Sequence, residues 1–239
     1  MTIKSLWLRR IHKWVGLAIG LQFVLWTISG AAMALLNMEA VAGGAIAEAP
    51  IPPPPGNSTA WPAIQAALSD RPVTALKLRP LLGRPTIEVT SAGETLLFDA
   101  GDGRPIAIDR ATARTIALAA HPGQAAVVRV TPLRSLDLAV REHRLPIWQI
   151  DFADAGNSSY YISGANGTVL ERRNDTWRWW DMFWMLHNMD YANRSSFNHP
   201  LIIAIGFAMT WLAATGFWLL FRTMWRHDFA WTRRNRLPR

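Results

Sequence analysis

The sequence predicts a membrane protein in which two transmembrane α-helices flank an α+β domain. Two apolar runs, at residues 14–36 and 199–221, lead to this prediction, and neither contains Asp, Glu, Lys or Arg. About 20 apolar residues, each rising ~1.5 Å, cross a hydrocarbon core about 30 Å thick. We therefore expect both runs to span a bilayer and the residues between them to form the domain.

Basic residues are concentrated on the outer sides of the two runs. Of the 25 Lys and Arg residues, 10 lie before the first run or after the second, where the only acid is Asp228. Positive charge beside a span remains in the cytoplasm, so we expect both termini inside and the central domain outside. The net charge of +8 therefore belongs to these flanks and does not indicate nucleic-acid binding.

The length of the first run and the absence of cysteine exclude several alternatives. Residues 14–36 exceed the apolar core of a signal peptide, which is about 7–15 residues long, so we expect a retained anchor. The chain contains no cysteine. Thiolate catalysis, iron–sulfur clusters and covalent c-type haem attachment are therefore excluded, and an outward-facing domain must be stable without disulfides.

Composition and turn signals divide the chain into segments. They are a basic N-terminal tail (1–13), the first span (14–36), a linker (37–56) with a proline-rich part (51–56), an α+β region (57–176), an aromatic interfacial helix and loop (177–198), the second span (199–221) and a basic C-terminal tail (222–239). In the α+β region we expect helices at 59–68 and 110–120, and strands at 73–78, 86–90, 95–99, 146–152, 158–162 and 168–172. Asn57 and Ser58 are the expected N-cap residues of the first helix. This pattern fits one compact domain or two small repeats.

The α+β region carries no recognisable catalytic motif. It contains no glycine-rich phosphate loop, no HExxH and no GxSxG sequence. Its two histidines, His121 and His143, are isolated in the sequence, and we expect both to be exposed and structural. Nothing in this region indicates catalysis.

Three histidines lie where the expected spans meet the membrane surface. His12 precedes the first span at the inner surface, whereas His187, in the aromatic segment, and His199, before the second span, lie at the outer surface. A histidine at such a depth is costly unless it has a partner. Neutral imidazoles on facing helices are common axial ligands of b-type haem, so His12, His187 and His199 are candidate ligands. The alternative is that each one hydrogen-bonds the backbone or lipid head groups.

Small residues follow one face of each expected span. By helical projection, one stripe contains His12, Gly16, Gly20, Thr27, Gly30 and Ala34, and the other contains His199, Gly206, Thr210 and Ala213. Such stripes either allow close helix packing or leave space for a flat macrocycle. A second histidine ligand at the inner surface would come from His227 or from the His12 of another copy. A symmetric homodimer that forms a four-helix bundle would supply the latter.

Motifs along nearly the whole chain resemble those of PepSY-associated transmembrane proteins. The segments RIHKWVGLAIGL (10–21) and WTISG (26–30) resemble their first span, and WWD (179–181), LHNMDY (186–191), FNHP (197–200) and TGFW (215–218) are similar to their closing helix. The segments LPIW (145–148), YYIS (160–163) and NGTVL (166–170) resemble a PepSY strand–hairpin, and FDAGDGRP (98–105) resembles a second copy.

This resemblance implies a location and a function. Larger members of the family are bacterial inner-membrane proteins tied to iron uptake, including ferric-siderophore reductases that pass electrons through membrane haem. It implies an inner-membrane protein with a periplasmic domain, and His12, His187 and His199 as the haem-ligand candidates. Those reductases have four spans, whereas this chain has two.

Two functions remain open on this basis. The first is a homodimeric haem-b electron-transfer subunit that serves the reduction of periplasmic iron or another metal. The second is a non-enzymatic, membrane-tethered PepSY module that binds and regulates an envelope protein or a peptidase, or that serves as an accessory subunit of a transporter.

Overall fold

The computed structural model describes residues 3–44, 53, 56, 59–69, 71–192, 194, 196 and 198–234, with the backbone alone for residues 3–5 and 223–234. The chain divides into two compact units, which are considered separately. Unit 1 comprises Met1–Leu35 and Trp180–Arg239, and unit 2 comprises Leu36–Trp179. Helix α5 (Asp175–Asn188) crosses the division between them.

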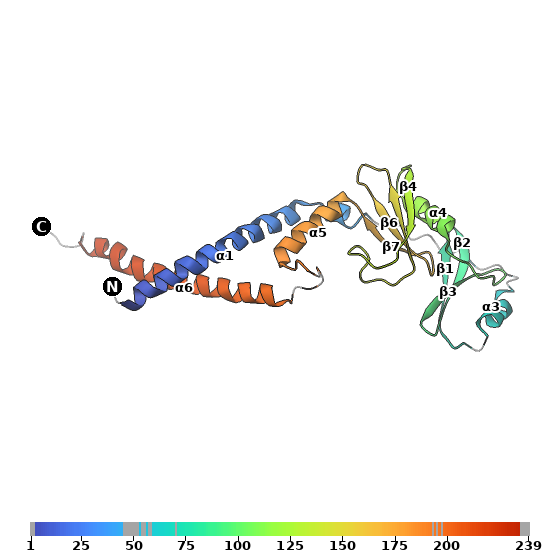
Figure 1. The fold of residues 1–239 in the computed structure, drawn as a ribbon, viewed down its shortest axis with the longest axis horizontal. Coiled ribbons are helices and arrows are strands. Elements are labelled where there is room, and N and C mark those ends of the chain that lie inside the picture. The colour runs from blue at the N-terminus through green and yellow to red at the C-terminus, as the bar shows by residue number, and fades with distance from the viewer. Residues whose placement is uncertain are drawn as a thin grey trace. The chain divides into compact units, whose positions relative to one another are not determined.

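Unit 1 is built from two long helices. Helices α1 (Ile3–Leu35) and α6 (Pro200–Arg234) lie side by side and run in opposite directions (Figure 1). Long apolar runs without an internal proline form both helices, and Pro200 occupies the first position of α6, where its missing N–H and fixed φ are tolerated. Both helices continue into the basic flanks beyond the apolar runs.

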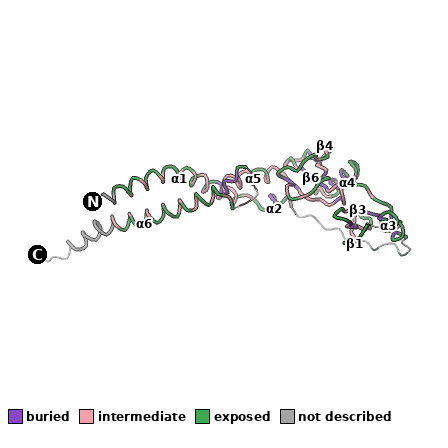
Figure 2. Tube along the Cα trace, turned by 60° about the horizontal axis from the view of Figure 1, so that its bottom comes forward, coloured by how far each residue is buried: buried purple, intermediate pink, exposed green. Residues whose placement is uncertain are grey.

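Most of the apolar surface of these two helices faces outward. Figure 2 shows exposed and intermediate residues along almost the whole described length of both. Leu21 is 70 % exposed and Phe207 is 74 % exposed. Within α1 and α6, Leu6–Leu35 and Pro200–Arg222 are long and apolar enough to cross a membrane. Apolar helices with so little buried surface are compatible with transmembrane helices and unlike the core helices of a soluble protein.

Unit 2 contains two antiparallel sheets. The first has the order β1-β2-β3, with β1 at Val73–Leu81, β2 at Arg84–Ser91 and β3 at Glu94–Asp99. The second has the order β4-β5-β6-β7, with β4 at Val127–Pro132, β5 at Ile147–Phe152, β6 at Ser159–Ser163 and β7 at Val169–Arg173. A short helix, α2 (Met38–Val41), precedes them.

Each sheet is covered by one helix. Helix α3 (Ala60–Leu68) packs Ile64 and Leu68 against the first sheet, and α4 (Arg110–Ala120) packs Ile116 against the second. The two layers are joined by Arg79 of β1, which donates hydrogen bonds to Asn166 O at 3.0 Å and to Thr168 Oγ1 at 2.9 Å.

Hairpin turns set the register of the first sheet. Leu82 and Gly83 join β1 to β2 with positive φ at both residues, and Ala92 and Gly93 join β2 to β3 in the same way. Two-residue turns with this backbone match the right-handed twist of antiparallel strands. The glycine accepts this conformation without strain, whereas Leu82 and Ala92 hold the less favourable first position.

The helices and strands expected in the α+β region are all present, and the structure adds β4 and, in the expected linker, α2. Helix α4 has the predicted bounds, and Asp109 caps it by accepting a hydrogen bond from Thr112 N at 2.8 Å. The sequence analysis missed β4. The N-cap prediction for α3 was wrong, because Thr59 holds that position and makes no side-chain capping bond. Asn57, Ser58 and most of the proline-rich part lie outside the described residues.

Candidate functional site at the histidines of the long helices

His12 lies on α1 and is held from α6. Its Nδ1 is 2.7 Å from Thr215 Oγ1, and the Thr215 hydroxyl donates to Trp211 O at 2.8 Å. In the arrangement in which the hydroxyl proton stays in that bond, Thr215 Oγ1 accepts from His12 Nδ1, and the neutral ring then carries its proton on Nδ1. His12 Nε2 is therefore left with its lone pair.

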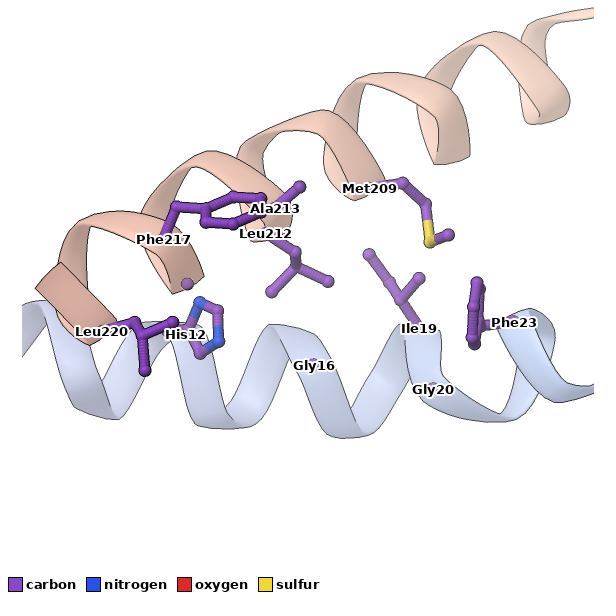
Figure 3. A pocket seen from close by; sticks show the side chains of 11 residues that line it. His12, Gly16, Ile19, Gly20, Phe23, Met209, Leu212, Ala213, Phe217 and Leu220 are labelled. Carbon is purple, nitrogen blue, oxygen red and sulfur yellow. The ribbon is translucent and has the colours of Figure 1, made fainter.

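A groove between α1 and α6 lies beside this imidazole. The α1–α6 groove has a volume of about 520 Å³ and is lined by His12, Gly16, Ile19, Gly20, Phe23, Met209, Leu212, Ala213, Gly216, Phe217 and Leu220 (Figure 3). Its size lies within the range of small-molecule and cofactor sites. His12 is the one titratable side chain of this lining, so the groove is apolar apart from a single imidazole.

Glycines leave the groove open. A Cβ at Gly20 would meet nothing within 4 Å, and one at Gly16 would approach only Leu212 Cδ2, at 3.8 Å. A Cβ at Gly216 would lie 3.4 Å from His12 Cε1. Of the two interpretations of the stripe on α1, the structure therefore favours open space over close packing at Gly16 and Gly20.

One member of the stripe expected on the second helix lines this groove. Of its four members, Ala213 lines the groove, whereas Gly206 faces open space, since a Cβ there would meet nothing within 4 Å. His199 precedes α6, which begins at Pro200. The face of α6 toward α1 instead follows Met209, Leu212 and Gly216.

His187 packs against the other end of α1. Its Nδ1 donates to Trp26 O at 3.1 Å and lies 3.3 Å from Ser29 Oγ, which itself donates to Leu25 O at 2.7 Å. The ring lies against Gly30, where a Cβ would be 3.0 Å from His187 Cε1. The bond to a carbonyl requires a proton on Nδ1, and the neutral ring then has its lone pair on Nε2.

Three residues close to His187 in the sequence or in space carry buried side-chain N–H donors without hydrogen-bond partners in the described part of the chain. Gln22 Nε2, Trp26 Nε1 and Asn188 Nδ2 are buried and have no hydrogen-bond partner among the described residues. Gln22 and Trp26 are one turn apart on α1, and the Trp26 ring centroid is 5.6 Å from that of His187. A buried N–H group without an acceptor is costly, so these three donors are candidates to bind an acceptor outside the described residues.

His199 uses the opposite ring nitrogen. Its Nε2 donates to Asn188 O at 2.5 Å, which leaves Nδ1 as the nitrogen with the lone pair. This bond joins the end of α5 to the start of α6. Arg194, between α5 and α6, also pairs with Asp181 of α5; its Nη1 lies 2.7 Å from Asp181 Oδ2.

The structure divides the three candidate ligands between two places. His187 belongs to the end of α5 and His199 bonds to that end through Asn188 O, whereas His12 contacts Thr215 of α6. His12 and Gly30, against which His187 lies, are about 27 Å apart along the α1 axis. His12 and His187 of one chain therefore do not share one metal ion.

The two histidines of the α+β region are paired rather than isolated. His121 Nε2 is 3.2 Å from Asp154 Oδ2, with the His121 side chain only 7 % exposed, and His143 Nε2 is 2.9 Å from Glu171 Oε1. The expectation that both are exposed was wrong, because the second sheet brings distant carboxylates to them. Burial raises the pKa of Asp154, but hydrogen bonds from Ser158 and His121 outweigh it and leave that pKa below its ordinary value.

The described residues contain no group of three or more His, Cys, Asp or Glu side chains that could hold a metal ion. No family model, curated protein or solved structure matches the chain. The candidate site therefore rests on its own geometry. Sequence reasoning missed Thr215 as a partner of His12; its one signal was a hydroxyl within an otherwise apolar run.

Proposed function

We propose that this chain is a bacterial inner-membrane haem-b protein of the PepSY-associated type that passes electrons to iron or another metal in the periplasm. In this proposal α1 and α6 span the bilayer, both basic ends are cytoplasmic, and unit 2 is periplasmic. The outward-facing apolar side chains of the two helices support insertion, since lipid would cover them. The basic flanks support the orientation.

The observation that carries the proposal is the state of His12. A metal-binding imidazole typically donates its other N–H to a fixed acceptor, which sets the tautomer and raises the basicity of the ligating nitrogen. Thr215 can be such an acceptor, and His12 lines an apolar groove that also contains Gly16, Gly20 and Gly216. These residues fit a flat macrocycle held through its iron. A bound haem would supply one-electron transfer at this place.

A second copy of the chain completes the proposed site. The groove has one imidazole, whereas b-type haems in helical membrane proteins are usually held by two. In a symmetric dimer, His12 of the partner would supply the second ligand. The side chain of His227 is not among the described ones.

His187 is proposed as a second ligand position and His199 as a positioning residue. Trp26, whose ring centroid is 5.6 Å from that of His187, and Gln22, one turn away on α1, carry buried N–H groups without partners among the described residues. Such donors suit the carboxylates of a haem or a similar anionic group. His199 instead holds the connection between α5 and α6 through its Nε2–H.

The test is an absorption spectrum of the full chain, purified in mild detergent from haem-replete cells. The dithionite-reduced minus air-oxidised difference should show Soret and α bands at about one haem per chain or per dimer, and a ferric chelate should return the reduced form to the oxidised one. A triple variant at His12, His187 and His199 should lose both bands. A flat spectrum from folded wild-type protein would contradict the proposal.

A second function is favoured by one observation in unit 2. Within the described part of the chain, no strand pairs with the outer edge of β4, and a groove lies beside it. This favours a membrane-tethered module that binds and regulates another envelope protein, or an accessory transporter subunit. Under that function the His12 variant would keep every property of the wild type, and crosslinking from the periplasmic side would recover the partner.

A further inference from the structure

The outer edge of β4 offers backbone hydrogen-bonding groups. β4 is the terminal strand of its sheet and pairs only with β5. Leu133 N donates to Ile147 O at 2.9 Å. Because backbone groups in antiparallel strands alternate between facing and leaving the partner, Arg129 and Thr131 also face β5, and Val130 presents its N–H and C=O on the outer edge.

A groove runs between this edge and helix α4. The β4–α4 groove has a volume of about 530 Å³ and is lined by Asp109, Arg110, Ala111, Arg114, Val127, Val128, Arg129 and Val130. The two elements lie next to each other in unit 2 (Figure 1). An extended peptide can enter such a groove as an added strand, with main-chain bonds to the edge and side chains against the helix.

The charge of the groove is basic. Arg110 and Arg114, on α4, are exposed and form no ion pair among the described residues. Arg129 is 71 % exposed and its Nε is 4.0 Å from Asp151 Oδ2, which is a weak pair. The one acid of the lining, Asp109, is engaged as the cap of α4; the hydrogen bonds from Thr112 keep its pKa below the ordinary value.

Apolar surface lies along the same edge. Val128 is 64 % exposed, and Val130 packs partly against the core of the second sheet. Exposed apolar edge strands are usually protected, because they pair with other chains. The bulge between Val127 and Arg129 and the proline at 132 limit this edge to a short stretch. The available stretch therefore suits a short strand rather than an extended sheet.

We propose that the β4–α4 groove binds an extended acidic segment of another protein, which adds to β4 as a further strand. Val130 pairs with its backbone, and Arg110, Arg114 and Arg129 neutralise its carboxylates. A second copy of the chain is a poorer occupant, because it would bring the same arginines to the same edge. This site is independent of the histidines of unit 1.

The test uses the full chain in detergent and two labelled peptides, one alternating valine with glutamate and one alternating valine with lysine. Fluorescence anisotropy should show binding of the glutamate peptide and none of the lysine peptide. The variant Arg110→Glu/Arg114→Glu should weaken binding about tenfold or more, since it places like charges in contact. The matched control Arg84→Glu/Arg104→Glu changes the net charge equally, at exposed residues outside the groove, and should bind as the wild type does.

Amide hydrogen exchange distinguishes strand addition from simple charge attraction. The glutamate peptide should slow exchange of the Val130 amide in the wild type. Absence of binding, equal weakening by both double variants, or binding without protection of Val130 would each overturn the proposal. So would a concentration-dependent dimer of the chain alone that protects the same amide, because a second copy would then be the occupant.

Discussion

His12 Nδ1 and Thr215 Oγ1 lie 2.7 Å apart and join α1 to α6 within two otherwise apolar helices. The Thr215 hydroxyl proton is directed to Trp211 O, so the threonine acts as an acceptor. With the hydroxyl as acceptor, the neutral His12 ring carries its proton on Nδ1 and offers Nε2 to a metal. This bond therefore connects the pairing of the two helices with the proposed chemistry.

Replacing Thr215 with valine should weaken the proposed haem site without unfolding the helices. Valine has nearly the shape of threonine but cannot accept the Nδ1 proton. Loss of such an outer partner typically costs about 10–100-fold in affinity for the bound group. Transfer of haem to excess apomyoglobin should become faster by that order.

Thr210→Val is the matched control for this variant. Thr210 Oγ1 donates only to Gly206 O of its own helix and contacts no histidine. Its haem transfer should equal that of the wild type. Equal transfer rates from both variants would show that the contact of Thr215 with His12 does not matter for binding.

Filling the α1–α6 groove should exclude the cofactor while the protein stays folded. A Cβ at Gly20 meets nothing within 4 Å, so Gly20→Leu adds its side chain to open space. We expect the Soret absorbance to fall by most of its amplitude while the thermal midpoint stays near that of the wild type.

Ala18→Leu supplies the comparison. Ala18 is exposed and does not line the groove. This variant should retain haem fully. Retention of haem by Gly20→Leu would place the binding site elsewhere.

Substitution of Gly30 should displace His187. Alanine in place of glycine normally stabilises a helix by about 0.5–1 kcal/mol. At Gly30 the added Cβ would lie 3.0 Å from His187 Cε1, and the ring is fixed by its bond to Trp26 O. We therefore expect Gly30→Ala to lower the thermal midpoint, as followed by near-ultraviolet circular dichroism.

The corresponding change at Gly206 separates the two effects. A Cβ there has no neighbour within 4 Å, so Gly206→Ala should match or exceed the wild-type midpoint. A Gly30→Ala midpoint equal to that of Gly206→Ala would mean that His187 does not pack on α1 as described.

The pairing of Asp154 with His121 should make unit 2 sensitive to acid. A carboxyl whose folded pKa is lowered contributes stability above its unfolded value, here 3.8, and loses it as the pH falls through the folded value. Asp154→Asn should lower the free energy of unfolding by about 1–3 kcal/mol at neutral pH. The difference from the wild type should shrink below about pH 4.

Glu94→Gln is the exposed comparison for this measurement. Its side chain is 69 % exposed and pairs with Arg71 at the surface, so its effect should stay within about 0.5 kcal/mol. Both variants are compared with the wild type by thermal unfolding over a pH series. An Asp154→Asn difference that persists unchanged into acid would contradict the role of its charge.

The local structure followed from patterns within short stretches of chain. The periodicity of residues 110–120 and the cap at Asp109 were sufficient for α4. The missed strand β4 contains Val127, Val128 and Val130, which are typical strand residues, but it lies between an expected helix and a proline and was not recognised.

The site depended on contacts that no short pattern contains. His12 and Thr215 are 203 residues apart in the sequence, and His121 and Asp154 are 33 apart. The sequence marked His12 as unusual because a histidine beside an apolar run needs a partner. The identity of that partner depends on the rotation of α6 about its axis, which the small residues of that helix do not define.

The measurement that tests the central claim most directly is the haem content of His12→Ala beside that of the wild type and of His143→Ala. All three are purified as full chains in detergent, and reduced minus oxidised spectra are normalised to folded protein. The account predicts a Soret band in the wild type and in His143→Ala, and loss of most of that band in His12→Ala. A His12→Ala variant with the full wild-type band would contradict the assignment of His12 Nε2 as a ligand of haem iron.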